Sequence, residues 1–314
     1  MSEKKIIAVV GATGAQGGGL ARAILADPNG DFAVRAITRN AGSDRAKALA
    51  DAGAEVVEAD LTDQASVERA FAGAYGVYLV TNFWEHGSPA KELAEAEVGA
   101  NAAKAAGVRH VIWSTLEDTR NHLPLSDERV PVLEGRYTVP HFDAKAEANE
   151  LFTARGIPTT FLQTTFYYEA FIAGMPPSRD SDGALVLTFP MSDAQLSGVA
   201  SEDIGRTAYG IFKRGDEFIG KTVSVAGDHL TGDEYAALLT KTLGEPVGYR
   251  PFSFDEFRAL GFPFAEEIGN MFQFYAEAQD DFVGARDLKL VRELNPELQS
   301  FDTWLEQNKD RIPR

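Results

Sequence analysis

The sequence predicts an α/β protein in which a doubly wound parallel sheet is followed by a smaller, mostly helical C-terminal lobe. Short apolar segments alternate with longer helical segments through the first half of the chain, and a glycine-rich turn directly follows the first apolar segment. The second half is less regular and ends in segments of helical composition. Repeated strand–helix units imply parallel strands joined by right-handed crossovers, with helices on both faces of the sheet.

The first half of the chain is expected to alternate regularly between strands and helices. Its first strand, 6–10, is wholly apolar, which is typical of a central strand covered on both faces. Gly53 closes the second helix, and Pro140 suits the first turn of the fifth. We expect strands at 6–10, 33–38, 55–59, 76–81, 110–114 and 159–164, helices at 15–26, 44–52, 63–72, 89–106 and 140–154, and a long loop at 116–139.

The second half is expected to form the lobe, with part of it returning to the sheet. Thr231 with Glu234, and Ser253 with Glu256, have the spacing of capping boxes at helix starts. The predicted division is a dinucleotide-binding domain at 1–158 and a smaller substrate or partner lobe at 159–314. Further strands are expected at 184–189 and 222–226, the latter joining the main sheet beside 159–164, and helices at 202–213, 232–243, 254–260, 265–278 and 303–308.

Composition and charge exclude several classes of function. The chain has 314 residues, enough for a large core without metal or disulfide bonds, and it contains no cysteine. With 30 Lys and Arg against 47 Asp and Glu, the net charge is −17, which argues against direct binding to nucleic acid or an anionic membrane. The first residues lack the pattern of a signal peptide, and no apolar run approaches about 18 residues. The simplest expected location is the cytoplasm.

The most informative motif is a run of glycines between the first strand and the first helix. Gly11, Gly14 and Gly17 have the spacing G-x-x-G-x-x-G. The first permits a tight turn, the second leaves room for a pyrophosphate beside the backbone, and the third allows close packing of helix on strand. The start of the helix offers free N–H groups to phosphate. The motif in this context predicts a Rossmann-type dinucleotide site.

The residues after the second strand favour NADP(H) over NAD(H). An NAD-selective site usually has an acidic residue there that bonds the ribose 2′-hydroxyl, but this chain has Arg39. A guanidinium can bind a 2′-phosphate through two hydrogen bonds, and Ser43 and Arg45 follow closely. Asp60 and Leu61 follow the third strand, where they are expected beside the adenine. Asp60 can bond the exocyclic amine of the adenine there, or it can simply cap the next helix.

Other strand ends supply further candidates for contact with the cofactor. Thr81, Asn82 and Phe83 lie at the end of the fourth strand and are expected along the cofactor, although Phe83 also suits a pocket wall or an ordinary core. The aromatic segment that contains Tyr167 follows the sixth strand, at the expected place of the nicotinamide. The five histidines show no metal-ligand spacing, so no metal site is expected. There is neither a G-x-S-x-G nucleophile turn nor a phosphate loop ending in Lys-Ser/Thr.

His141 and Lys145 are the candidate catalytic residues. Hydride-transfer enzymes of this architecture often place Tyr-x-x-x-Lys on one helix face, and here histidine replaces the tyrosine. In one interpretation Lys145 binds the nicotinamide ribose and no chemistry follows. In another, His141 or Lys145 supplies a proton, as the titration range of histidine permits. In the third, His141 is an exposed residue of the first helical turn.

Seven segments resemble the NmrA-like family, a branch of atypical short-chain dehydrogenases/reductases. The resemblance spans nearly the whole chain and is closest to the NADPH-sensor type represented by NmrA-like domain-containing protein 1. The segments are 11–18 (GATGAQGG), 34–40 (VRAITRN), 80–85 (VTNFWE), 141–147 (HFDAKAE), 234–241 (EYAALLTK), 270–275 (NMFQFY) and 303–307 (TWLEQ).

This resemblance implies a Rossmann domain with a C-terminal lobe that binds NADP(H). One departure is the segment 41–45, AGSDR, where the sensor-type relatives have further basic residues. The cofactor contacts implied by the family fall on Gly11, Thr13, Gly14, Ala15, Gln16, Gly17, Arg39, Lys145 and Tyr167.

Two functions follow as hypotheses. The first is a redox sensor, a regulatory protein that responds to the balance of NADPH and NADP⁺. The second is an NADPH-dependent reductase of quinones or other small unsaturated substrates that uses Lys145, so enzymatic activity stays open. The expected partners are the dinucleotide and either a small substrate or another protein, with a homodimer also conceivable.

Overall fold

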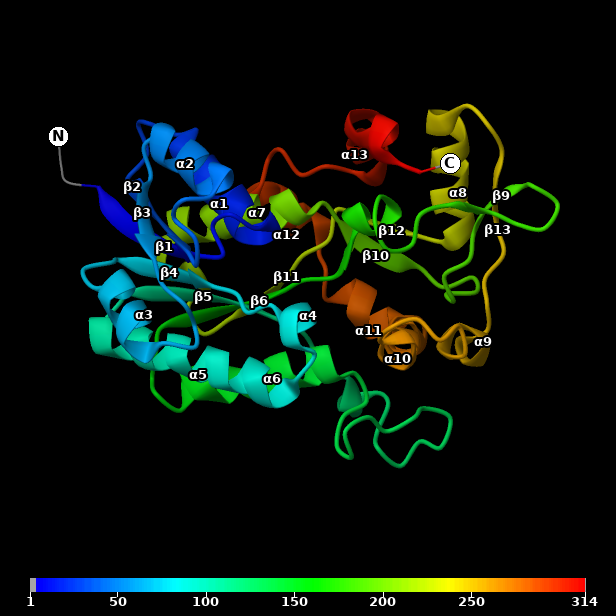
Figure 1. Ribbon diagram of the computed structural model, residues 1–314, viewed down its shortest axis with the longest axis horizontal. Coiled ribbons are helices and arrows are strands. Elements are labelled where there is room, and N and C mark those ends of the chain that lie inside the picture. Colours follow the sequence, from blue (N-terminus) through cyan, green and yellow to red (C-terminus); the bar gives the residue numbers. More distant parts are fainter. Residues whose placement is uncertain (1–3, 314) are drawn as a thin grey trace.

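The computed structural model describes residues 4–313 and has a seven-stranded parallel sheet at its centre (Figure 1). The strand order, β11-β6-β5-β4-β1-β2-β3, confirms the doubly wound arrangement. All neighbouring strands of this sheet run parallel. The strands are β1 (Lys5–Val10), β2 (Phe32–Thr38), β3 (Glu55–Glu58), β4 (Gly76–Leu79), β5 (His110–Thr115), β6 (Thr159–Gln163) and β11 (Thr222–Ser224).

Helices cover both faces of this sheet. Figure 1 shows α3, α5 and α6 on one side and α1, α2, α7 and α12 on the other. Two separate apolar clusters, one for each face, fill the space between the helices and the sheet. The helices are α1 (Ala15–Leu25), α2 (Asp44–Asp51), α3 (Gln64–Phe71), α5 (Pro89–Ala106), α6 (Pro140–Thr153), α7 (Ser201–Lys213) and α12 (Leu288–Leu294).

Two of these helices, α1 and α7, pack with their backbones nearly touching. A Cβ atom on Gly19 would lie 2.3 Å from the carbonyl oxygen of Glu202. A Cβ atom on Gly205 would lie 2.2 Å from the backbone nitrogen of Leu20. Glycine is therefore required on both helices, and α7, although late in the sequence, belongs to the layer that supports the glycine-rich turn.

The C-terminal lobe is built around a third apolar cluster, in which many of the side chains are aromatic. It contains the two predicted capping boxes, which begin α8 and α9. Two small sheets, β12-β10-β7 and β13-β9-β8, accompany the helices. The elements are β7 (Phe166–Tyr167), β8 (Ser178–Arg179), β9 (Leu185–Leu187), β10 (Leu196–Val199), β12 (Asp228–Leu230), β13 (Val247–Tyr249), α8 (Gly232–Leu243), α9 (Phe254–Arg258), α10 (Ala265–Glu277), α11 (Gln279–Gly284) and α13 (Phe301–Asn308).

The strand order reverses between β1 and β4, and this switch point positions the site. Ligands of open α/β sheets bind outside the carboxyl ends of the strands at such a point. A one-turn helix, α4 (Phe83–His86), follows β4 here, where the sequence predicted only the end of a strand. The lobe lies beyond the same strand ends, so α10 meets the N-terminus of α6.

Candidate functional site

A cavity of about 1040 Å³ lies at the carboxyl ends of the sheet strands, between the sheet domain and the lobe. Every residue that the sequence singled out for cofactor contact or catalysis lines it. Its volume suits a large organic ligand. The predicted residues in its wall are Gly11, Thr13, Gly14, Ala15, Gln16, Gly17, Arg39, Asp60, Leu61, Thr81, Asn82, Phe83, His141, Lys145 and Tyr167.

The glycine-rich turn has the geometry that a phosphate site needs. Gly11 has φ of 65°, a left-handed conformation that favours glycine. A Cβ on Gly17 would lie 2.6 Å from the Gly11 carbonyl oxygen, so the helix could not approach the turn with any other residue there. Gly14 precedes α1 and no side chain caps that helix end. The first N–H groups of α1 are therefore available to an anion, and the turn fits a dinucleotide pyrophosphate.

The side chain of Gln16 forms hydrogen bonds with residues of three strands at the base of the cavity. Its amide nitrogen donates to the Tyr167 hydroxyl at 2.5 Å. Its amide oxygen accepts from the hydroxyls of Tyr78 at 2.5 Å and Ser114 at 2.7 Å. Burial raises the pKa of both tyrosines, so both phenols stay neutral at physiological pH. The Gln16 side chain thus joins α1 to β4, β5 and β7 in addition to the cofactor role predicted for this residue.

The end of the cavity near β2 and β3 carries an ion pair that the sequence did not reveal. Arg39 donates to the carboxylate of Glu85 on α4, which raises the pKa of Arg39 and lowers that of Glu85. Arg45 Nη1 donates to the Thr13 carbonyl oxygen at 3.3 Å. Asp60 accepts from its neighbour Thr62, and these bonds lower its pKa. The positive charge of Arg39 is therefore already compensated by nearby carboxylates in the absence of a cofactor phosphate.

Lys145 is held in a buried ion pair. Its Nζ lies 2.6 Å from Glu92 Oε1 and donates to Thr81 Oγ1 at 2.6 Å. Glu92 is 0% exposed and Lys145 only 8%. Thr81 in turn donates to Glu92, so the three side chains fix one another. The carboxylate keeps the ammonium group in place at the cavity wall, where the sequence predicted a ribose contact.

His141 is buried at the start of α6 rather than exposed. Its Nδ1 lies 2.7 Å from Glu267 Oε1, and its backbone N–H donates to the same oxygen at 2.8 Å. The imidazole packs against Trp84, with ring centroids 4.6 Å apart. Because a carboxylate only accepts, Nδ1 carries a proton and Nε2 is left for a ligand.

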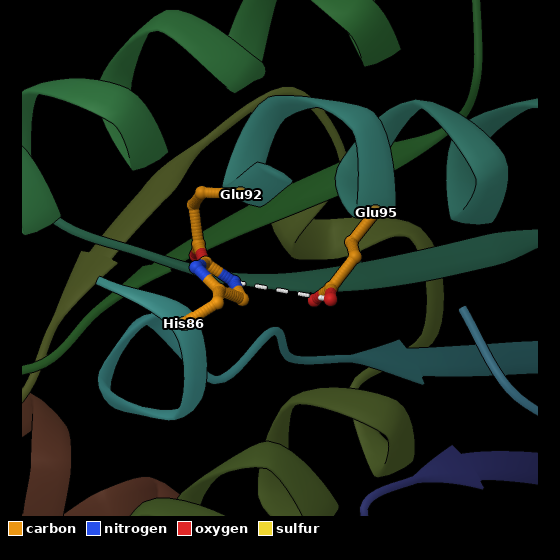
Figure 2. Close-up of side chains that lie close together, drawn as sticks. All are labelled: His86, Glu92 and Glu95. Carbon is orange, nitrogen blue, oxygen red and sulfur yellow. Dashed lines mark ion pairs between the residues drawn. The ribbon is translucent and has the colours of Figure 1, made fainter. Parts of the chain in front are cut away.

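Figure 2 shows a second histidine, His86, that points toward Glu92 and Glu95 on α5. Its Nε2 lies 3.6 Å from Glu92 Oε2 and 3.8 Å from Glu95 Oε1, and one potential ligand atom from each residue lies within 4.8 Å of the others. Burial, together with the charge of Glu92, raises the pKa of Glu95 to about 7.

The contacts of His86 decide what this group can bind. The backbone N–H of Ser88 donates to His86 Nδ1 at 3.0 Å, so the neutral ring carries its proton on Nε2. A metal ion at Nε2 requires that nitrogen to be deprotonated and Nδ1 to donate instead. This tautomer does not suit a metal ion at Nε2, and the carboxylate oxygens at 3.6 and 3.8 Å are too far from Nε2 for a normal hydrogen bond.

Three acidic residues that pair with the predicted site residues escaped the sequence analysis. Glu85 lies within a segment that was noted only for its resemblance, and Glu92 is one of several glutamates in an Ala- and Glu-rich helix. Glu267 is 126 positions from His141. Only the fold brings these carboxylates to Arg39, Lys145 and His141, and no local pattern marks them.

The chain is similar to known proteins over nearly its whole length. An NmrA-like family domain-containing oxidoreductase, FrzB, from Cladobotryum sp. is 29% identical over 294 residues, which cover 86% of this chain and 83% of that protein. The crystal structure of NmrA, a negative transcriptional regulator, in complex with NADP has a TM-score of 0.78 and 22% identity, over 98% of this chain and 95% of that one. An NADPH-dependent quinone oxidoreductase from Escherichia coli has a TM-score of 0.71 and 23% identity, over 96% and 98%.

Because the sequence identities to these two solved structures are low, the structural similarity is evidence for the fold alone. Across residues 4–313, the structure has no helix of the length and apolar character needed to cross a membrane. The profile of the NmrA-like family matches residues 3–305. The chain therefore belongs to the NmrA-like family.

Proposed function

We propose that the protein is an NADP(H)-dependent reductase of quinones or other small conjugated substrates. The observation that carries the proposal is the cavity, in which a turn suited to a dinucleotide is continuous with an apolar, aromatic end that contains Lys145 and His141. Relatives named as oxidoreductases, and a fold neighbour named as an NADPH-dependent quinone oxidoreductase, agree with it. The apolar end is lined by Phe83, Trp84, Phe166, Met175, Phe264, Ile268, Met271 and Tyr275.

Residues at different positions along the cavity bind different parts of the cofactor. When bound, the reduced nicotinamide supplies a hydride. The first turn of α1 binds the pyrophosphate, and Arg39 binds the 2′-phosphate. Lys145, fixed by Glu92 and Thr81, donates to the nicotinamide ribose and orients that end of the cofactor. The aromatic wall excludes water from the reacting carbon.

The direct test follows NADPH absorbance with purified protein across a panel of quinones, enones and imines. We expect saturable turnover with at least one conjugated acceptor and none without protein. The Lys145→Met variant is the control, since it keeps an unbranched side chain but loses the ammonium group. Saturable NADPH binding with no acceptor reduced would contradict the reductase proposal.

A second candidate, a regulatory sensor of NADP(H), is suggested by the ion pair of Arg39 with Glu85, which a bound 2′-phosphate would disturb. A 2′-phosphate on Arg39 competes with Glu85, and the same helix, α4, carries Trp84 against His141. Binding of NADPH at Arg39 would therefore act on α4 and on the contact of Trp84 with His141. Hydrogen exchange in α4 that NADPH and NADP⁺ alter to different extents, in a protein without turnover, would favour the sensor.

The preference for NADP(H) is expected to depend on both members of this pair. Arg39→Ala should remove the preference, since a hydrogen bond to a charged group contributes about 1.5–3 kcal/mol, or roughly 10- to 150-fold in affinity. Glu85→Gln should strengthen NADPH binding, because it removes a negative charge beside the phosphate and releases the guanidinium. Calorimetric titration with NADPH and NADH measures both. An unchanged NADPH/NADH ratio in Arg39→Ala would exclude the 2′-phosphate role.

A further inference from the structure

We propose that His141 and Glu267 form a proton-donating pair for a neutral, flat, conjugated carbonyl substrate. The inference rests on the proposed reductase function and deepens it. His141 donates the proton to the substrate oxygen, and Glu267 is a positioning residue that acts through His141. Lys145 is thereby left to orient the cofactor.

The geometry of the pair is well defined because two bonds converge on one oxygen. Glu267 Oε1 accepts from the backbone N–H of His141 at 2.8 Å and lies 2.7 Å from Nδ1. Both residues are buried, with 6% exposure for His141 and 4% for Glu267. Such a short contact with a carboxylate fixes the ring orientation and keeps a proton on Nδ1.

Two other histidines, His86 and His229, have the opposite tautomer in their neutral form. His86 accepts at Nδ1 from a backbone N–H, so its neutral ring has the proton on Nε2. His229 lies 3.0 Å from the Arg286 carbonyl oxygen through Nε2, which again requires a proton on Nε2. In His141 the proton of the neutral ring is instead on Nδ1, which donates to the Glu267 carboxylate. Nε2, for which residues 4–313 supply no hydrogen-bond partner, is available to a substrate.

The surroundings of His141 define the class of substrate. Its ring is flanked by Phe83, Trp84 and Phe142, with centroids 5.8, 4.6 and 4.8 Å away. Trp84 also meets Phe264 of the lobe at 5.5 Å, and both are partly exposed at the edge of the cavity. These aromatic faces favour a flat apolar ring system. An imidazolium at Nε2 favours a carbonyl oxygen and disfavours an iminium cation, so a quinone or enone is the preferred acceptor.

The proton balance of the reduction is complete with this pair. Hydride from bound NADPH adds to the conjugated system of the carbonyl compound, and the electron pair displaced from its π bonds moves onto the oxygen. The N–H bond at Nε2 breaks as the oxygen takes that proton. His141 is left neutral, with its remaining proton on Nδ1 toward Glu267, and regains a proton from solvent before the next turnover.

Glu267 also has a structural effect that the test must separate from proton transfer. The residue before α6 provides no side-chain cap for that helix. Glu267 instead accepts from the backbone N–H of His141 in the first turn of α6. Glu267→Gln keeps an oxygen that can accept both bonds but removes the charge. Glu267→Leu removes both the bonds and the charge. A purely structural role predicts that glutamine restores full function.

The experiment combines ¹⁵N-histidine NMR with kinetics on the full chain. In wild type, the neutral form of His141 should carry its proton on Nδ1, and His86 in the same spectrum should carry it on Nε2. Glu267→Leu should lose the Nδ1 tautomer of His141, and Glu267→Gln should retain it. With 1,4-naphthoquinone and NADPH, Glu267→Gln should lower kcat by about 10- to 100-fold. KM, NADPH affinity and Tm should stay near wild type.

Each result bears on a different part of the inference. A wild-type His141 that is protonated on Nε2 when neutral would overturn the pair. Wild-type kcat in Glu267→Gln would overturn the role of the charge. If the wild type reduces no acceptor in the panel, the reductase function fails, while the tautomer of His141 still decides whether the pair is assembled.

Discussion

Replacing Lys145 by methionine is expected to lower the free energy of unfolding by about 3–5 kcal/mol and to abolish productive cofactor use. The stability loss arises because the fully buried carboxylate of Glu92 would lose the ammonium group 2.6 Å from it. Removing one partner of a buried ion pair leaves an uncompensated charge in a medium of low dielectric constant. Urea unfolding measures the loss, and NADPH titration measures the binding.

The double variant Lys145→Met with Glu92→Gln separates the two effects. A neutral amide at position 92 no longer needs a cation, so most of the lost stability should return. Cofactor binding should stay weak, because the ribose contact depends on the lysine itself. A single variant as stable as wild type would show that Glu92 has no need of its partner. Full turnover in the double variant would exclude a role for Lys145 at the ribose.

The parts of the site that sequence predicted well depend on short stretches of chain. The turn at Gly11 and the opening of α1 are specified by glycine spacing within a few residues of one strand, and the structure has this turn and helix where they were expected. The order of strands and helices in the first half was likewise predicted, because apolar runs and glycine stops are local signals. Features that depend on a few neighbouring residues can therefore be predicted from the sequence pattern of those residues.

The parts that sequence did not predict depend on contacts across the fold. Glu92 can be recognised as a site residue only because the packing of α5 on α6 brings it to Lys145. Glu267 can be recognised only because the lobe contacts α6 at His141. The strands of the lobe, such as β7 and β12, are two or three residues long and too short for a periodic signal. The one-turn helix α4 was missed for the same reason.

The contact between α1 and α7 leads to the second large prediction. Gly205→Ala is expected to lower the free energy of unfolding by about 3 kcal/mol, at the upper end for an overpacked core. The added methyl group would lie 2.2 Å from the Leu20 nitrogen and 2.4 Å from the Gln16 carbonyl oxygen, and both are backbone atoms that cannot rotate away. The two helices must therefore separate.

That separation is also expected to weaken NADPH binding, although Gly205 does not line the cavity. Gln16 and Leu20 belong to α1, whose first turn provides the N–H groups for phosphate, so a shift of α1 moves those groups. Gly284→Ala is the matched control, because a Cβ there meets no atom within 4 Å, and as a helical residue it should gain about 0.4–1 kcal/mol of stability. Equal unfolding midpoints and equal NADPH affinities for the two variants would show that the close approach of α1 and α7 has no energetic consequence. A Gly205→Ala protein that is destabilised but binds NADPH normally would show instead that the glycine-rich turn holds its shape independently of α7.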